Sequence, residues 1–386
     1  MKNLKYKLYK SRKNKRLHKD LRGAAQIYNH CIALHKCYYR IFKKHLSLYK
    51  LQKHLTKLKR LEKYAHFKKI NSQVIQEITD RIERGYQLFF LGLKGKSSKI
   101  SPPGFKKSSK YRSMTFKQSG FKYLGTNKIK IGKHIYKFSL SRPVDGCIKT
   151  MTLKRDALGD FYLCFSVELE EEQIKTASDK IVGFDFGLQT FLKSTDNKDI
   201  ESPKFLEKEM CEIKQLSKRL SKKKKGSNNR RRARKALARK YKDIANKRHD
   251  WFFKTAHNLC KNYRLISLEG LDIKSMAKRF GKKISDYAFS EFVSILQYIA
   301  KKYTTIIHIC DQYYASSKLC SLCDNYNGLL KLSQRSWHCK NCCAHLDRDR
   351  NASYNILRAG ASAHGLGDIR PSLEAVSVRS QESHLL

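Results

Sequence analysis

Acidic residues are scarce in this sequence. Of its 386 residues, 33 are Asp or Glu and 83 are Lys or Arg, so the formal net charge is +50 at pH 7. A compact monomer does not carry such a charge without a polyanion to neutralise it. The shortage of acid therefore favours nucleic acid as the partner.

The sequence also lacks any apolar stretch long enough to cross a bilayer, or an amphipathic anchor. Residues 1–20 are charged without an apolar run behind them, so we expect neither a signal peptide nor a membrane segment. A disulfide framework is not indicated either. Eight of the 12 cysteines are scattered singly or lack zinc-like spacing, and the chain is long and poor in turns. We expect a cytoplasmic protein with reduced thiols and no membrane partner, long enough for two or three domains.

Residues 20–98 have helical periodicity. Apolar positions share one helical face over residues 21–42, and Asn71 or Ser72 can cap a later helix with an apolar stripe over 74–89. These helices predict a small basic bundle. With so many Lys and Arg, contact with a nucleic-acid backbone is favoured over a solvated spacer.

Residues 99–175 follow a two-residue period instead. Strands are predicted over 111–116, 128–131, 135–140, 147–153 and 161–167, with glycines and a turn at 156–160 between them. The pattern predicts a small antiparallel barrel or sandwich. Barrels of this size often bind oligonucleotides, although fold alone does not establish function.

Two apolar strands further along end in an acid next to glycine. The first covers 181–188 and carries Asp185, and the second covers 265–268 and is followed by Glu269. We expect the neighbouring glycines to leave room beside the Asp185 carboxylate. Either acid alone is more often a turn residue than a functional group.

A helical hairpin is predicted between those strands. Apolar stripes over 206–220 and 233–259 flank a break at 222–229. The tip of this hairpin collects the basic residues Lys222, Lys223, Lys224, Lys225, Arg230, Arg231, Arg232 and Arg234. A charge run is usually a solvated face, but the density of Arg favours binding to phosphates here.

A metal motif lies near the C-terminus. The pair Cys320 and Cys323 and the pair Cys339 and Cys342 are separated by fifteen residues, a spacing that suits a tetrahedral, structural Zn²⁺ site better than buried apolar cysteines. The predicted zinc ligands are these four thiolates.

A run of acids and bases, residues 346–352, follows the last cysteine pair and opens a helix. Two Mg²⁺ ions that cut a phosphodiester need carboxylates that converge on both ions. Asp185, Glu269 and one further acid provide such a set. Because Asp347 and Asp349 are two residues apart and face different ways, only one of them can join it, and the spacing leaves both open.

Four motifs together resemble the TnpB (OrfB) family, which comprises transposon-encoded RNA-guided nucleases related to type V CRISPR effectors. The motifs lie at 183–187, 268–271, 316–323 and 347–356, with further matches at 72–76 and in the hairpin. The resemblance extends from about residue 20 to residue 358. It is specific because the motifs also share the family's order and spacing.

The resemblance implies an α+β multidomain fold with an RNase H-like (RuvC) nuclease domain, a zinc ribbon, a small antiparallel β-barrel (wedge) and an N-terminal helical recognition bundle. The implied domains are a wedge barrel of 1–19 and 99–175, a recognition lobe of 20–98, a RuvC-like domain of 180–314 with a hairpin insert at 203–260, a zinc ribbon of 315–345 and a RuvC-like segment of 346–360. Residues 361–386 lack periodicity and are expected to be a disordered tail.

The implied function is that of an RNA-guided DNA endonuclease encoded by an insertion sequence. A guide RNA would pair with one strand of double-stranded target DNA next to a short flanking motif. The implied catalytic trio, which also holds two Mg²⁺, is Asp185, Glu269 and Asp349, and Asp347 is left to cap the helix or to support the metal ligands from behind. A prokaryotic protein of this kind would associate with the nucleoid through its DNA.

Two positions depart from the family, which usually has glycine where this chain has Asp324 and Cys343. Cys343, His338 or His345 could replace Cys342 at zinc. Three other functions stay open: a compact type V CRISPR effector, a nuclease-silent RNA-guided DNA-binding regulator, and a guide-free transposase accessory protein. The presence of all three acids argues against the silent regulator.

Overall fold

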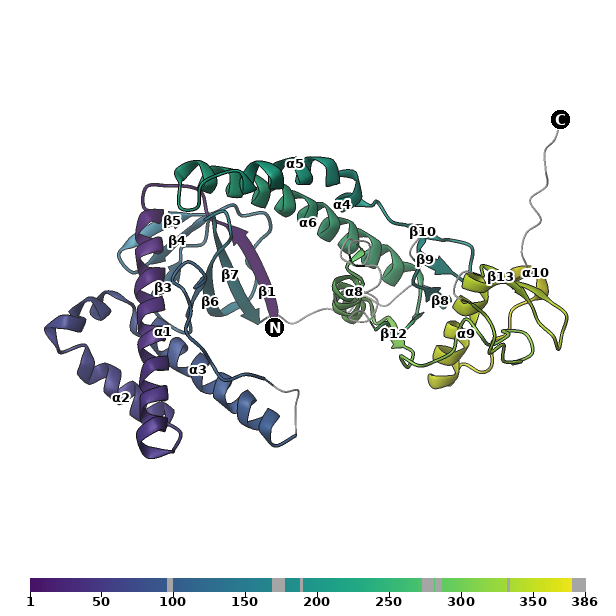
Figure 1. Cartoon of the computed structure of the whole chain (residues 1–386), viewed down its shortest axis with the longest axis horizontal. Helices are drawn as coiled ribbons and strands as arrows, with labels where there is room; N and C mark the ends of the chain where they lie inside the picture. The colour runs from purple at the N-terminus through teal and green to yellow at the C-terminus, as the bar shows by residue number, and fades with distance from the viewer. Residues whose placement is uncertain are drawn as a thin grey trace. The chain divides into compact units, whose positions relative to one another are not determined.

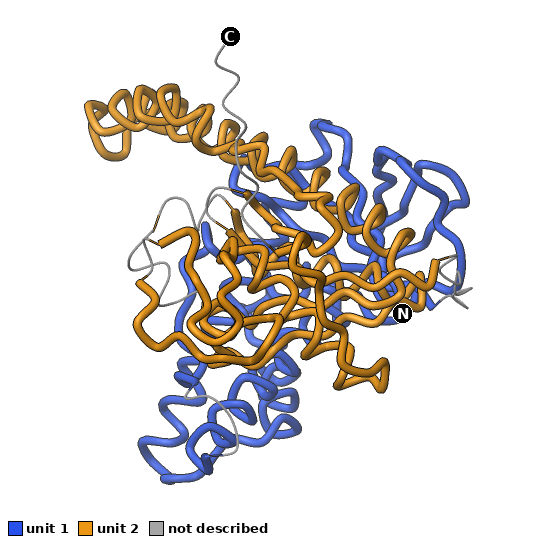
Figure 2. The backbone as a smooth tube through the Cα atoms, turned by 90° about the vertical axis from the view of Figure 1, so that its right-hand side faces the viewer, with its two compact units in different colours: residues 1–170 blue, residues 171–386 orange. Residues whose placement is uncertain are grey.

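The structure is a computed structural model of the chain. It describes residues 1–95, 100–168, 178–187, 190–272, 281, 287–331 and 334–376. The chain divides into two compact units, residues 1–170 and 171–386, which Figure 2 colours separately. The acidic stretch 169–179 is predicted from its sequence to be a linker, and all of it except residues 178 and 179 lies outside the described residues.

The first unit contains the predicted helices (Figure 1). They are α1 (Asn14–Phe42), α2 (Leu48–Leu58), the 3-10 helix η1 (Glu62–Lys69) and α3 (Ser72–Leu93). Of the two candidate caps, Asn71 begins α3, because its side chain accepts a hydrogen bond from the Gln73 N–H at 2.9 Å. Helix α1 ends where Lys43 turns into the left-handed region, at φ 50°.

The strands of the first unit form two antiparallel sheets. One has the order β1 (Lys2–Lys7), β7 (Phe161–Glu168), β6 (Cys147–Arg155), β2 (Ser113–Phe116), and the other has β3 (Phe121–Tyr123), β4 (Lys128–Ile131), β5 (His134–Lys137). Alternate residues of β7 are buried, as the two-residue period predicts. Strand β1 pairs with β7 although more than 150 residues separate them in sequence, with Leu4 opposite Phe165.

The second unit is built on one mixed sheet. Its order is β10 (Ile200–Glu201), β9 (Thr190–Ser194), β8 (Ile181–Asp185), β11 (Leu265–Leu268), β12 (Ile306–Ile309). Strands β8, β11 and β12 are parallel, whereas β9 and β10 run antiparallel to their neighbours. The carboxyl ends of β8 and β11 therefore meet at one edge of the sheet.

Six helices of the second unit have described bounds. They are α4 (Phe205–Lys208), α5 (Met210–Ser221), α6 (Asn228–Asn262), α8 (Phe289–Tyr303), α9 (Arg348–Ala363) and α10 (Leu373–Val376). An aromatic core fixes α6 and α8 on the sheet, and in it the Phe191 ring stacks on Phe252 and Phe289 with centroids 6.0 and 5.3 Å apart.

Helix α9 lies against the sheet at two glycines. A Cβ on Gly183 would come within 2.2 Å of the Ser353 carbonyl oxygen, and one on Gly360 within 1.9 Å of Ser267 Oγ. Only glycine allows this approach. Glycine was expected here to leave room beside the Asp185 carboxylate. The structure shows instead that the absence of a side chain at Gly183 makes room for helix α9.

The C-terminal part differs from the sequence prediction. Helix α9 continues to Ala363, and α10 follows at Leu373–Val376. Val376 is fully buried among Trp337 and Leu346. The prediction of a disordered tail is therefore wrong for residues 361–376. Only 361–363 and 373–376 are helical there, and such short stretches give no detectable periodicity. Residues 377–386 lie outside the described residues.

Candidate active site and metal centre

Asp185 and Glu269 meet at the carboxyl ends of two adjacent strands. Asp185 is the last residue of β8, and Glu269 directly follows β11, in which Leu268 pairs with Phe184. The two carboxyl groups are hydrogen-bonded to each other. Both residues are half-buried, so this pair is partly withdrawn from water.

The electrostatics of this pair favour a shared proton. Burial, followed by the carboxylates of Glu269 and Asp349, raises the pKa of Asp185 well above its usual range. Burial also raises the pKa of Glu269, although the hydrogen bond with Asp185 acts in the opposite direction. Both shifts therefore favour a proton held between the two carboxyl groups. Clustered acids of this kind are typical of sites that bind a cation.

The two aspartates at the start of α9 have different roles. Asp347 is the N-cap residue, and its Oδ1 accepts a hydrogen bond from the Arg350 N–H at 2.7 Å. Asp349 lies in the first turn, and its charge acts on both Asp185 and Glu269. The capping role expected of Asp347 is confirmed. Of these two aspartates, Asp349 is the one whose charge raises the pKa values of Asp185 and Glu269.

Two arginines hold Asp349. Arg348 Nη2 lies 3.1 Å from Oδ1, and Arg335 Nη1 lies 3.2 Å from Oδ2. Sequence reasoning missed both partners. The sequence places Arg348 directly beside Asp349. Arg335 is 14 residues from Asp349 and reaches it because β13 (Ser336–His338) pairs with β14 (His345–Asp347), which leads into α9.

The four predicted thiols converge. All four Sγ atoms of Cys320, Cys323, Cys339 and Cys342 lie within 4.8 Å of one another. The separations are 3.6 Å between Cys320 and Cys342 and 3.5 Å between Cys323 and Cys339, close to the ~3.8 Å edge of a tetrahedral Zn–S site. Within the described ranges, this quartet is the one group of three or more His, Cys, Asp or Glu side chains that converges in this way.

The two knuckles repeat one backbone geometry. The residue after each second cysteine, Asp324 or Cys343, has a left-handed conformation, with φ of 62° and 58°. Its N–H donates to the carbonyl of the first cysteine at 2.9 Å, from Asp324 to Cys320 and from Cys343 to Cys339. Glycine suits both positions because it adopts positive φ without strain.

The competing ligands lie elsewhere. Cys343 is exposed and is absent from the quartet. His338 of β13 (Ser336–His338) and His345 of β14 (His345–Asp347) pair across the ribbon, and their rings stack with centroids 4.1 Å apart. The geometry therefore favours Cys342 as the fourth ligand. Burial raises the pKa of Cys320, whereas hydrogen bonds from Asn341 and the Asn325 backbone outweigh burial and lower the pKa of Cys323 to about 6.

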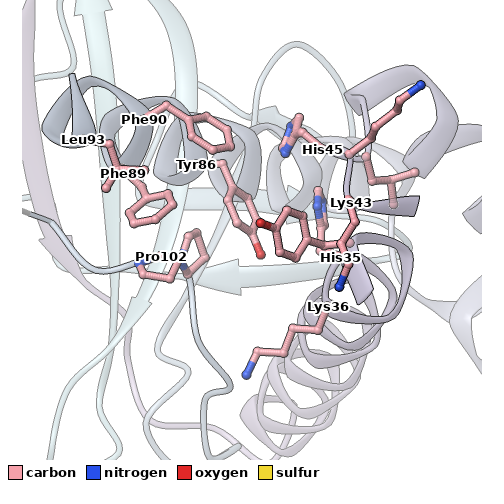
Figure 3. Close-up of a pocket in the computed structure, with 13 residues that line it drawn as sticks. His35, Lys36, Lys43, His45, Tyr86, Phe89, Phe90, Leu93 and Pro102 are labelled. Atoms are coloured by element: carbon pink, nitrogen blue, oxygen red, sulfur yellow. The ribbon is translucent and has the colours of Figure 1, made fainter. Parts of the chain in front are cut away.

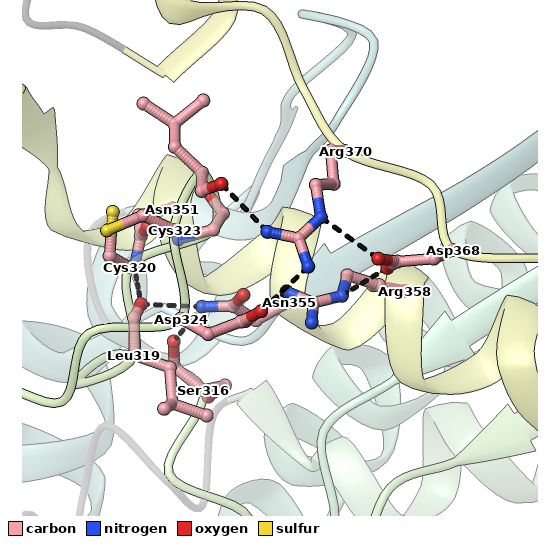
Figure 4. A network of polar contacts seen from close by, with 12 residues as sticks. Ser316, Leu319, Cys320, Cys323, Asp324, Asn351, Asn355, Arg358, Asp368 and Arg370 are labelled. Atoms are coloured by element: carbon pink, nitrogen blue, oxygen red, sulfur yellow. Dashed lines mark hydrogen bonds and ion pairs between the residues drawn. The ribbon is translucent and has the colours of Figure 1, made fainter. Parts of the chain in front are cut away.

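Two buried amides join the first knuckle to α9, as Figure 4 shows. Asn351 Oδ1 accepts from the Ser321 N–H at 2.8 Å, and Asn351 Nδ2 donates to the Leu319 carbonyl at 2.7 Å. Asn355, one turn later, donates to the carbonyls of Ser316 and Leu319 at 2.8 and 2.7 Å. The ribbon is thus tied to the helix that carries Asp349. Paired asparagines four residues apart were the sequence signal for this contact.

Asp324 takes part in a second set of contacts. Its carboxylate lies 2.5 Å from Arg358 Nη1 and 2.7 Å from Arg370 Nη2 (Figure 4). Arg370 also donates to the Leu322 carbonyl at 2.8 Å. The C-terminal segment that carries Arg370 therefore contacts the knuckle formed by Cys320 and Cys323.

The basic hairpin has an exposed tip between α5 and α6. Seven of the eight predicted basic residues are exposed, namely Lys222, Lys223, Lys224, Lys225, Arg231, Arg232 and Arg234. Arg230 is the exception, because its Nη1 donates to the carbonyls of Leu220 and Lys223 at 2.9 and 2.7 Å and so closes the tip. Ser227 caps α6 by accepting from the Arg230 N–H.

Comparison with known proteins identifies the family. The family "Probable transposase" (OrfB_IS605) matches residues 164–279, and the family "Cas12f1-like, TNB domain" matches residues 289–356. A Streptomyces pristinaespiralis protein named "Putative RNA-guided DNA endonuclease" is 30% identical over 329 residues, which are 83% of this chain and 80% of the relative. The chain belongs to the TnpB (OrfB) family.

Other relatives of this TnpB-family chain agree. The Escherichia coli (strain K12) protein "Putative RNA-guided DNA endonuclease InsQ" is 23% identical over 361 residues, 89% of this chain and 88% of that protein. The chain of the "Cas12f1-sgRNA-target DNA complex" matches with a TM-score of 0.56 and 15% identity over 90% of this chain and 83% of that chain. This likeness shows a common fold. The chain combines α-helices and β-sheets, which confirms the α+β prediction at this coarse level.

No helix in the described parts combines the length and the apolar character needed to cross a bilayer.

Proposed function

We propose that this chain is an RNA-guided endonuclease that cuts double-stranded DNA. The observation that carries the proposal is the hydrogen-bonded pair of Asp185 and Glu269, on which the charge of Asp349 also acts, in a TnpB-family chain of net charge +50. Buried, hydrogen-bonded acids whose pKa values are raised become stable as two carboxylates only when a cation joins them. A polyanionic substrate brings such cations to the site.

The residues fit Mg²⁺ because their donor atoms are carboxylate oxygens. Asp185, Glu269 and Asp349 would hold two ions, which supply an activated water and stabilise the leaving oxygen of the phosphodiester. Asp185 must first give up its shared proton. Asp349 must exchange part of its contact with Arg335 and Arg348 for the metal. The site then acts chiefly by fixing geometry in an RNase H-like (RuvC) domain.

The remaining residues divide between structure and binding. Cys320, Cys323, Cys339 and Cys342 would hold one structural Zn²⁺, because their spacing fits four thiolates around one ion. The exposed lysines and arginines of the hairpin tip would contact the phosphates of guide RNA or target DNA. In this scheme the RNA provides sequence specificity and the protein recognises shape and a short flanking motif.

Co-expression with the DNA that flanks the gene tests this function. We expect a single co-purifying RNA with a constant part and a variable end. The complex should then cut a matching DNA duplex in Mg²⁺ and not in EDTA. Heterogeneous RNA, or none, together with strand transfer by the free protein, would contradict the proposal and favour a guide-free transposase.

A compact CRISPR effector is the second candidate, favoured by the match to the "Cas12f1-like, TNB domain". It shares the same chemistry. The origin of the RNA discriminates the two, because a CRISPR guide derives from a repeat array and a transposon guide from the end of the element.

A further inference from the structure

The first unit contains a cavity for which the nuclease chemistry has no use. It lies between the C-terminal parts of α1 and α3 and has a volume of about 480 Å³ (Figure 3). That volume is within the range of small-ligand sites. All 13 residues that line it belong to the first unit and are described.

Aromatic rings form one wall of the cavity. Tyr86, Phe89 and Phe90 all lie on α3 (Figure 3). Phe90 is 38% exposed, and the neighbouring wall residue Leu93 is 69% exposed. Apolar groups left open to solvent in a hollow of this kind mark a binding surface. The Tyr86 ring is held in place because it stacks on His35, with centroids 4.7 Å apart.

The charge at the cavity has one sign. Lys36, Lys43 and Lys44 line it, and no acid is among its lining residues. Glu83 lies behind the wall, where it accepts from His45 at 3.1 Å. An aromatic wall with a cationic rim matches a ligand that combines a flat ring with a phosphate.

His35 adds an unsatisfied polar atom. Its side chain is 4% exposed, and its Nε2 has no hydrogen-bond partner among the described residues. Burial, and then the neighbouring His45, lowers the pKa of His35 to about 4, so the ring is neutral at pH 7. Buried polar atoms normally have a partner, and a bound ligand is one source of it.

We propose that this cavity holds one unpaired nucleobase of the bound RNA, stacked on the α3 aromatic wall, with adjacent phosphates at Lys36, Lys43 and Lys44. The proposal rests on the proposed function, because it requires an RNA partner. RNA loops and ends present unstacked bases, whereas the bases of duplex DNA stay inside the helix. The stack is sequence-tolerant, since every base has a flat face.

Ultraviolet crosslinking of the purified protein–RNA complex tests the proposal, with peptides mapped by mass spectrometry. We expect an RNA adduct on the peptide that carries Tyr86–Phe90 before any DNA is added. Phe90→Ala should lower its yield roughly 5- to 160-fold, the range for one base–aromatic stack. Leu88→Ala is the matched control, because Leu88 is 47% exposed on the same helix and does not line the cavity.

A second variant avoids the aromatic core. Lys43 and Lys44 are both exposed, so K43Q/K44Q leaves the fold intact and should lower the adduct yield in a salt-dependent way. No adduct on α1 or α3 in an RNA-bound complex that still cuts DNA would overturn this proposal alone. So would an adduct that forms only with target DNA, or a dimer that Phe90→Ala dissociates. Absence of co-purifying RNA would instead refute the proposed function.

Discussion

The thiol quartet and the carboxylate cluster are both suited to cations, but they are assembled in different ways. Each knuckle closes on itself, because the N–H of Asp324 or Cys343 bonds to a carbonyl four residues back. The acids instead come from β8, the end of β11 and α9, which are far apart in sequence. A metal ribbon is thus a property of short segments, whereas the acid site depends on correct strand pairing and helix docking.

The two sites also differ in what they do without a cation. Burial and like charge raise the pKa of Asp185, so the acid cluster opposes its own ionisation. In the quartet, hydrogen bonds outweigh burial and lower the pKa of Cys323 to about 6, so one thiol favours the thiolate. The pKa values of the other quartet thiols Cys320 and Cys342 are raised, first by burial, so the quartet combines both directions whereas the acid pair shows one.

The largest expected effect is a loss of DNA cleavage, without a loss of binding, when an acid of the Asp185, Glu269 and Asp349 cluster is removed. Asp185→Ala should reduce DNA cleavage by about a thousandfold or more, because one metal ligand is lost while the phosphate contacts remain. Guide and target binding, measured by filter binding, should stay within about twofold of the wild type. Asp311→Asn is the control, since Asp311 is exposed in the same unit. Loss of binding by Asp185→Ala would contradict the assignment.

The thiol quartet should show the opposite behaviour. Cys320→Ser with Cys323→Ser should remove bound zinc and unfold the ribbon, because structural zinc contributes directly to folding. Metal content and protease sensitivity of the C-terminal part provide the readouts. Cys343→Ser should keep its zinc, since Cys343 lies outside the quartet. Zinc loss in that control would make Cys343 a ligand and Cys342 the bystander.

The link between the two sites can be weakened by itself. Asn351→Ala leaves the Ser321 N–H and the Leu319 carbonyl without this partner, although Asn355 still reaches that carbonyl. We expect a loss of about 1–3 kcal/mol in the free energy of unfolding, with zinc retained and cleavage reduced. Urea unfolding and metal analysis measure this, with Asn327→Ala as the control. Unchanged stability would mean that the ribbon docks without this amide.

The smallest expected effect concerns pH in the absence of divalent metal. Because folding raises the pKa of Asp185, the unfolded chain loses this proton at lower pH, and stability should fall as pH rises from about 4 through the folded pKa. Asp185→Asn mimics the protonated acid and removes this loss. At pH 8 it should melt about 2–4 °C above the wild type, which corresponds to about 1 kcal/mol.

Below about pH 4 the wild type and Asp185→Asn should have the same melting temperature, because Asp185 of the wild type is then protonated in both the folded and the unfolded chain. Added Mg²⁺ should stabilise the wild type and leave Asp185→Asn nearly unchanged. Equal melting temperatures at pH 8 without metal would show that the acid pair is not strained.

Local patterns predicted much of this molecule. Four of the seven strands of the first unit followed from the two-residue period and a fifth in part, and the start of α3 followed from its cap. Two strands escaped the pattern. Phe121–Tyr123 is too short for a clear period, and Lys2–Lys7 alternates with lysine but gains its partner only from β7.

What the sequence determined by itself was the set of reactive groups and the ribbon. The cysteine pairs, the acids before glycine and the Asp347 cap all rest on contacts within a few residues, which spacing encodes. What only the tertiary structure decided was which groups meet: the hydrogen bond between Asp185 and Glu269, the contact of Arg335 with Asp349, and the helix that fills the space beside Gly183. Those contacts join segments distant in the chain, and their geometry depends on the packing of the whole unit.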